Sequence, residues 1–234
     1  MAITKRQKAW TGDRTKTYTL AEAIKLVKAN AKTKFNESID VAVNLGIDTK
    51  QSDQNIRGML PLPHGTGKSV RAAVMARGAK AEEAKKAGAD IVGAEDLADA
   101  ILAGQINFDR LIATPDMMPL IGKLGKVLGP KGLMPNPKLG TVTMDVTKAV
   151  TEAKSGAIEF RAEKAGIVQC GVAKTNMSED QIADNINALI EALLRAKPQT
   201  SKGVYLQRIS ISSTMGPGFK VDVSVYGSAA TKVA

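Results

Sequence analysis

Residues 62–70 read "LPHGTGKSV", and this stretch separates two parts of the chain that have different residue patterns. Before it, apolar residues alternate with polar or small ones over residues 38–47, which is typical of a strand with one buried face. After it, short apolar segments at residues 70–76, 90–93 and 110–113 alternate with helical segments. This alternation of strand and helix indicates a parallel sheet covered by helices.

The two-residue period returns after Gly156 and continues into the last strand pattern, which includes Val204, Val223 and Val225. Both ends of the chain therefore share one character, and the middle has another. We predict a discontinuous α+β domain, formed by residues 1–67 and 158–234, into which an α/β domain of residues 68–157 is inserted. The junctions would lie near "LPHGTGKS" and "AKSGAIEF", which are short and suited to a hinge.

Two capping boxes predict where helices begin in the discontinuous domain. Thr19 with Glu22, and Ser178 with Gln181, can each satisfy free N–H groups at a helix N-terminus. Apolar residues at helical spacing follow both boxes. We therefore predict a first helix that ends near Lys34 and a second, longer helix.

The opening stretch also ends like the phosphate-binding loop of an ATPase or GTPase, with Gly67, Lys68 and Ser69. That loop needs a further glycine five positions before Gly67, where its turn lets backbone N–H groups surround phosphates. Leu62 occupies this position. A P-loop-like, nucleotide-dependent enzyme is therefore the alternative hypothesis, to be tested by ATP and GTP binding.

Charge is the strongest compositional signal. The chain has 33 lysines and arginines against 23 acids, a net charge of +10, and two long stretches without any acid. A polyanion is the natural partner of such a chain. Aromatic residues make up only 3%, so we expect contact through charge, backbone and shape rather than through stacked rings. A basic RNA chaperone without a fixed site is a third possibility.

Few residues suit catalysis or metal binding. His64 is the only histidine and Cys170 the only cysteine, so a His-pair or cysteine-cluster metal site is not expected. His64 has no recognisable nucleophile to assist, and we predict a structural or hinge role for it. We expect no catalytic residue, no metal and no cofactor, and, because no apolar run could cross a bilayer, a cytoplasmic protein without a membrane partner.

Two segments have the composition of a surface that contacts phosphate. The first, residues 122–143, combines glycines and prolines with four lysines and no acid, and we predict a basic loop that uses Lys123, Lys126, Lys131 and Lys138. Its alternative is a surface loop held by its own prolines. The second, "STMGPG" at residues 213–218, would let its backbone approach a flat partner closely, or would simply form a β-turn with a glycine bulge.

Six motifs occur in an order and at spacings that resemble one protein family. They are "SDQNIRG", "LPHGTGK", "ATPDMM", "LGPKGLMPNPKLGTVT", "IEFRAEKAG" and "TMGPG". Together they are similar to the family of bacterial ribosomal protein L-one, over about residues 19–220. The resemblance implies a non-enzymatic two-domain protein of the 50S ribosomal subunit, with a Rossmann-like inserted domain. It makes "HGTGKS" an interdomain crossing instead of an ATP site. The hinge residues that we predict at the two junctions are His64, Gly65, Gly67, Ser155 and Gly156.

The resemblance also implies the partners and the contact residues. The partners would be ribosomal RNA of the large subunit at the mobile stalk, exit-site tRNA whose release the stalk assists, and the messenger RNA of the protein's own operon, which family members repress. Phe35 is expected to support packing rather than to stack on a base. The RNA-binding residues carried over onto this chain are Lys34, Phe35, Ser38, Thr214, Met215 and Gly216.

Overall fold

The computed structural model describes residues 8–201 and 203–227, with the side chains of Ser52 and Lys138 left undescribed. The chain divides into two compact units. The first unit contains the described residues up to Gly67 and from Ile158 onward, and the second contains residues 68–157. Each unit has its own apolar core, and each is described separately below.

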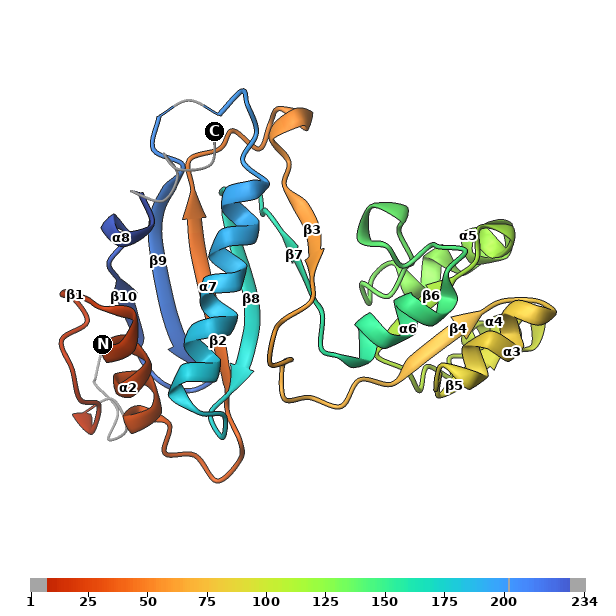
Figure 1. The fold of residues 1–234 in the computed structure, drawn as a ribbon, viewed down its shortest axis with the longest axis horizontal. Helices are drawn as coiled ribbons and strands as arrows, with labels where there is room; N and C mark the ends of the chain where they lie inside the picture. The colour runs from red at the N-terminus through yellow and green to blue at the C-terminus, as the bar shows by residue number, and fades with distance from the viewer. Residues whose placement is uncertain (1–7, 202, 228–234) are drawn as a thin grey trace. The chain divides into compact units, whose positions relative to one another are not determined.

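A five-stranded sheet in the order β1-β10-β9-β2-β8 is the centre of the first unit (Figure 1). Its strands are β1 (Thr17–Tyr18), β2 (Ser38–Leu45), β8 (Ile167–Lys174), β9 (Leu206–Ser213) and β10 (Gly218–Val221). Strand β1 is parallel to β10, and the other neighbours are antiparallel. Strand β2, which lies between β9 and β8, buries alternate residues, as its two-residue period predicts.

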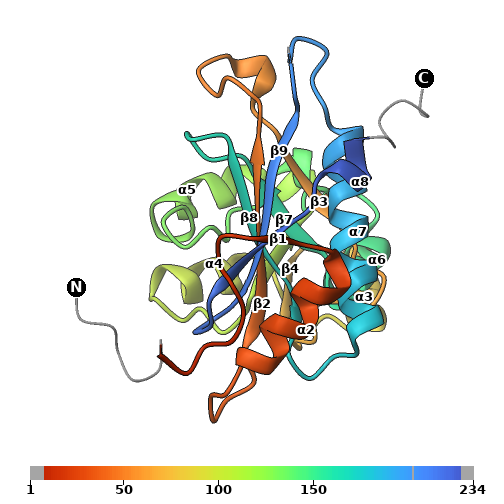
Figure 2. The ribbon, with the colours of Figure 1, turned by 90° about the vertical axis from the view of Figure 1, so that its left-hand side faces the viewer.

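Two helices cover one face of this sheet, α2 (Leu20–Asn30) and α7 (Glu179–Arg195), as Figure 2 shows. Both predicted capping boxes are confirmed, because the Thr19 and Ser178 side chains accept the expected N–H groups and Glu22 and Gln181 reach back. The apolar stripe of α7 is fully buried against the sheet. It consists of Ile182, Ile186, Leu189, Ile190 and Leu193.

Helix α2 ends at Asn30, so the prediction of an end near Lys34 is wrong. The buried Asn30 amide donates to the Thr11 and Leu26 carbonyls and its oxygen accepts the Thr11 N–H at 2.9 Å. Ala31 then leaves the helical conformation, with φ −79° and ψ 79°. The residues after Asn30 are therefore free to form the connection into β2.

The strand predictions extend too far at the C-terminal end. Val204 precedes β9, and Val223 and Val225 follow β10, because the Asp222 carboxylate accepts the Ser224 N–H and begins the short helix α8 (Ser224–Gly227). The first unit also contains the 3-10 helix η1 (Ser52–Gln54). The first unit also contains a two-stranded antiparallel sheet, which is formed by β3 (Arg57–Leu60) and β7 (Ile158–Arg161).

The second unit contains a parallel three-stranded sheet in the order β5-β4-β6. The strands are β4 (Ala72–Met75), β5 (Ile91–Gly93) and β6 (Arg110–Ala113). The predicted alternation of strand and helix is present. The helices between and after these strands are α3 (Ala79–Lys86), α4 (Glu95–Leu102), η2 (Pro115–Met117), α5 (Met118–Leu128), η3 (Pro137–Leu139) and α6 (Val146–Lys154).

Strand β4 is buried on both faces, which explains its continuous apolar sequence. Ala73 and Met75 belong to a core shared with α4 and α5, whereas Ala72 and Val74 belong to a core shared with α3 and α6. Helices therefore cover both faces of the sheet, as a parallel sheet requires. In the described residues, no helix has both the length and the apolar character needed to cross a membrane.

The basic segment of residues 122–143 is not a single loop, so this part of the prediction is wrong. Lys123 and Lys126 lie on α5, and only the part after Leu128 is a loop, with one short 3-10 helix. Ile121, Leu124 and Leu128 have helical spacing and are fully buried. This apolar stripe forms the helix despite glycines that disfavour one.

Candidate nucleic-acid interface

Two segments predicted to bind RNA, which are far apart in the sequence, meet at one end of the five-stranded sheet. The Ser38 N–H donates to Thr214 Oγ1 at 3.0 Å, and the Thr214 N–H donates to the Ser38 carbonyl at 3.1 Å. These contacts continue the pairing of β2 with β9, in which Ile39 lies opposite Ser213. The start of β2 and the loop after β9 therefore form one surface.

The large side chains of this surface face solvent. Phe35 is 55% exposed and Met215 is 48% exposed, and Lys34 and Thr214 are also exposed. Phe35 is therefore only partly packed against the protein, and the expectation that it supports packing stays a prediction. Two exposed apolar side chains next to an exposed lysine can contact bases and phosphates together.

Gly216 is required by close packing inside the loop. A Cβ atom added to it would lie 2.4 Å from the Ser213 hydroxyl oxygen, which is buried. The Gly216 N–H donates to the Ser213 carbonyl at 3.3 Å, which closes the turn. The loop is therefore a tight turn over the end of β9, and its glycine is as much an internal requirement as a feature of the outer surface.

A buried acid lies directly beneath this surface. Glu37 is only 1% exposed, and its carboxylate accepts the Met215 N–H at 3.0 Å and the Thr33 hydroxyl at 2.8 Å. Burial raises the pKa of Glu37, but these hydrogen bonds outweigh burial and hold the pKa below its ordinary value. The Ser213 hydroxyl lies near the carboxylate and also lowers its pKa, although its geometry falls short of a hydrogen bond.

Lys174 is a cation of this surface that sequence reasoning missed. Its amine donates to the Ser38 hydroxyl at 2.8 Å, because the two residues lie opposite each other at the ends of β8 and β2. The amine also lowers the pKa of Asp40, whereas the larger effect of burial raises it above its ordinary value. Only the strand register reveals this proximity, and a sequence does not state which strands are neighbours.

The sheet face opposite α2 and α7 is polar and built from small residues. Arg208 and Lys220 add positive charge to it from β9 and β10. The residues of β2 that alternate with its buried ones, and those of β9 that do so from Arg208 onward, point to this face and are exposed or half-exposed. On these two strands they are Ser38, Asp40, Ala42, Asn44, Arg208, Ser210 and Ser212.

The basic residues of the second unit form their own group. Lys123, Lys126 and Lys131 pair with no acid among the described residues, and Lys123 and Lys126 lie on α5. The side chain of Lys138 is outside the part that the structure describes. Unneutralised lysines on one helix and the following loop suit contact with a phosphate backbone.

The segment that resembles a phosphate-binding loop has a different structure. Lys68 forms an ion pair with Asp109 at 3.1 Å, and the chain continues from Ser69 into strand β4. A phosphate-binding loop must instead lead into a helix, whose N-terminal N–H groups face the phosphates. Leu62 is buried in the core of the first unit. The local structure therefore contradicts the nucleotide-binding alternative at Lys68 and Ser69.

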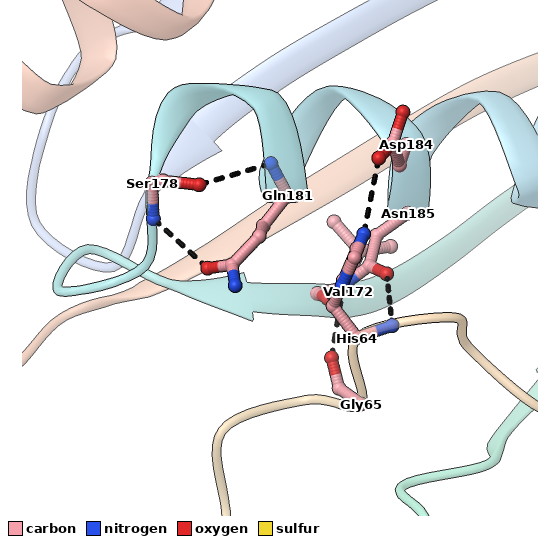
Figure 3. Close-up of polar contacts among 7 residues, drawn as sticks. All are labelled: His64, Gly65, Val172, Ser178, Gln181, Asp184 and Asn185. Atoms are coloured by element: carbon pink, nitrogen blue, oxygen red, sulfur yellow. Dashed lines mark hydrogen bonds and ion pairs between the residues drawn. The ribbon is translucent and has the colours of Figure 1, made fainter.

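His64 and Gly65 are bound to helix α7, as Figure 3 shows. The buried Asn185 amide donates to the carbonyls of Gly65 and Val172 at 2.8 and 2.9 Å, and its oxygen accepts the His64 N–H at 3.2 Å. His64 Nε2 lies 3.0 Å from the Asp184 carboxylate. These contacts hold His64 and Gly65 against α7, and the hinge role of both residues stays a prediction.

The remaining predicted hinge residues have backbone conformations that suit turns. Gly67 has φ 69° and Gly156 has φ 90°, in the left-handed region that favours glycine. Ser155 follows the last residue of α6 as its C-cap, and its hydroxyl donates to the Glu152 carbonyl. Their role as a hinge stays a prediction. Among the described residues, no cluster of three or more His, Cys, Asp or Glu side chains could hold a metal ion.

This fold and surface define a basic, two-unit protein that presents exposed lysine, hydroxyl and apolar side chains at one end of a sheet. Residues 27–217 match the model of the Ribosomal protein L1p/L10e family. Because the match covers most of the chain, the chain belongs to this family. The family is one of large-subunit ribosomal proteins that bind ribosomal RNA, and it is not a family of enzymes.

Proposed function

We propose that the first unit binds the stalk region of large-subunit ribosomal RNA near the tRNA exit site. The contact residues in this proposal are Lys34, Phe35, Ser38, Thr214, Met215 and Gly216. The observation that carries it is the pair of hydrogen bonds between Ser38 and Thr214, which unites segments 176 residues apart into one exposed surface. A surface assembled from remote segments with exposed apolar and basic groups is typical of a binding site.

Each side chain has a chemical role in this proposal. Lys34 neutralises phosphate, and the Ser38 and Thr214 hydroxyls reach ribose 2′-OH groups or phosphate. Phe35 and Met215 contact unstacked bases, for which their exposure of about half makes them available. The turn at Gly216 keeps the loop close to the sheet, so RNA can approach the backbone.

For the second unit we propose an inserted Rossmann-like domain with a secondary RNA contact. The parallel order β5-β4-β6 with helices on both faces supports the domain type. The contact would use Lys123, Lys126, Lys131 and Lys138, toward ribosomal RNA or exit-site tRNA. The absence of acids from residues 117–144 supports a phosphate partner here.

The proposal has three further parts, which concern two activities and the location of the protein. The protein assists release of deacylated tRNA from the exit site. It represses translation of its own operon by binding a similar RNA structure in the messenger. Both activities place it in the cytoplasm. The resemblance of "GLMPNPK" and "TMGPG" to bacterial ribosomal protein L-one supports them.

A binding titration tests the proposal. The protein is titrated with a stalk-region ribosomal RNA fragment and with a scrambled RNA of the same length, at physiological salt. We expect a preference of about a thousandfold or more, the lower end for specific nucleic-acid sites. Equal affinity for both RNAs would contradict the fixed site and would favour a general basic RNA binder.

A further inference from the structure

We propose that Glu37 is a positioning residue that holds the RNA-binding surface in shape without touching RNA. Its buried carboxylate connects the segment before β2 with the loop after β9. This inference rests on the proposed function of that surface. Glu37 lies between the proposed contact residues Phe35 and Ser38 but is not one of them.

Glu37 accepts hydrogen bonds from three parts of the chain. One carboxylate oxygen accepts the Met215 N–H at 3.0 Å, and the other accepts the Thr33 hydroxyl at 2.8 Å. The Glu37 carbonyl accepts the Thr175 N–H at 3.0 Å. Met215 is one of the proposed contact residues, and Thr33 directly precedes another, Lys34, so the carboxylate fixes the distance between the two halves of the surface.

The presence of an acid at this place needs an explanation. The chain carries a net charge of +10, and an acid next to a phosphate-binding surface repels the ligand. Burying a carboxylate is also costly unless hydrogen bonds compensate. A carboxylate, however, accepts two donors at once and binds them more strongly than a neutral acceptor. Glu37 is therefore suited to fix a backbone N–H and a hydroxyl from different segments.

The position of the Thr33 hydroxyl predicts that glutamine can replace Glu37 without loss of these hydrogen bonds. It lies 3.0 Å from the Phe35 carbonyl as well as 2.8 Å from the Glu37 carboxylate. In Glu37→Gln the amide nitrogen can donate to the Thr33 oxygen, while the hydroxyl proton goes to Phe35. The amide oxygen can still accept the Met215 N–H. Glutamine therefore preserves every connection and removes only the charge.

The experiment compares Glu37→Ala, Glu37→Gln and a matched control, Glu191→Ala. Glu191 is an exposed acid on α7, the helix that covers the other face of the sheet. Its replacement by alanine removes one negative charge, as Glu37→Ala does, but away from the proposed RNA surface. Each full-length variant is titrated with the stalk RNA fragment and with scrambled RNA over a range of salt concentrations. In parallel, hydrogen exchange of the Met215 amide is measured without RNA.

For a positioning role we expect Glu37→Ala to lose about tenfold or more in affinity for the stalk RNA, on the scale of a hydrogen bond to a charged group. Its affinity for scrambled RNA and its salt dependence should stay unchanged. Glu37→Gln should restore stalk RNA binding, and Glu191→Ala should resemble the unmodified protein. Exchange of the Met215 amide should accelerate in Glu37→Ala alone.

Several results would overturn the inference. Unchanged stalk RNA affinity in Glu37→Ala would show that the connection is dispensable, and tighter binding by both Glu37 variants would show that only its charge matters. If Glu37→Ala does not fold, Thr33→Val removes one connection and should weaken stalk RNA binding by about threefold. A lack of preference in the unmodified protein would instead overturn the proposed function, while Met215 exchange still reports on the connection itself.

Discussion

At the scale of single residues, the Thr214 hydroxyl has an internal partner in addition to its proposed RNA contact. It accepts the Ser38 N–H at 3.0 Å, so Thr214→Val leaves this donor without a partner. We expect a loss of about 1 kcal/mol in the free energy of unfolding together with weaker stalk RNA binding. Thr214→Ser keeps the hydroxyl and should preserve both. Urea unfolding and RNA titration measure the two effects, and a Thr214→Val variant of unchanged stability would contradict the first.

The contact between Gly216 and Ser213 predicts a dependence of one substitution on the other. Gly216→Ala places a Cβ atom 2.4 Å from the Ser213 hydroxyl oxygen and should destabilise the loop. Adding Ser213→Ala removes that oxygen, and the next atom, the Ser213 Cβ, lies 3.6 Å away. We expect the double variant to recover stability and RNA affinity. Strictly additive effects in this double-mutant cycle would contradict the explanation.

The lowered pKa of Glu37 predicts how stability depends on pH. A carboxyl group whose folded pKa lies below its ordinary value of 4.5 stabilises the fold above that value. This contribution is lost as the pH falls through the lower, folded pKa. We therefore expect the stability advantage over Glu37→Gln to be constant near neutral pH and to shrink below about pH 4.5. Urea midpoints of both proteins across this range measure it, and a constant difference would contradict the assignment.

At the scale of elements, sequence reasoning succeeded where the signal is local. The capping boxes at Thr19 and Ser178 involve residues three positions apart, and both helices begin where predicted. The end of α2 at Asn30 depends instead on contacts with Thr11, which a helical pattern does not contain. The same holds for the site, because the proximity of Ser38 and Thr214 follows from strand pairing.

Helix α5 shows a second limit of sequence reasoning. Its glycines and lysines indicated a loop, yet the buried stripe of Ile121, Leu124 and Leu128 decides its structure. Glu37 was missed for a related reason. Between Asn36 and Ser38 it looks like a solvated acid, and only the converging N–H and hydroxyl groups explain its burial.

Helix α5 also carries a prediction about its glycines. A Cβ atom added at Gly122 would meet nothing within 4 Å. Gly122→Ala should therefore stabilise the second unit by about 0.5–1 kcal/mol, the usual gain for replacing a helical glycine. Urea unfolding followed by hydrogen exchange in α5 measures the gain. A loss of stability would mean that the helix does not continue through Gly122 as described.

At the scale of the whole molecule, each unit has cores that contain none of the other unit's residues. This separation predicts that the two units lose stability independently. Leu124→Ala empties a fully buried position in the second unit and should cost about 2–5 kcal/mol there. Leu189→Ala is the matched change in the first unit, at an equally buried position on α7.

Hydrogen exchange on the full chain separates these effects. In Leu124→Ala, amides of β4 and β6 should exchange faster while those of β2 and β9 keep their protection, and Leu189→Ala should show the reverse. The proposed RNA-contact residues of the first unit lie at the ends of β2 and β9. Stalk RNA affinity should therefore fall in Leu189→Ala and persist in Leu124→Ala. If either substitution accelerates exchange equally in both units, the chain unfolds as one cooperative body, and the division of cores does not determine its stability.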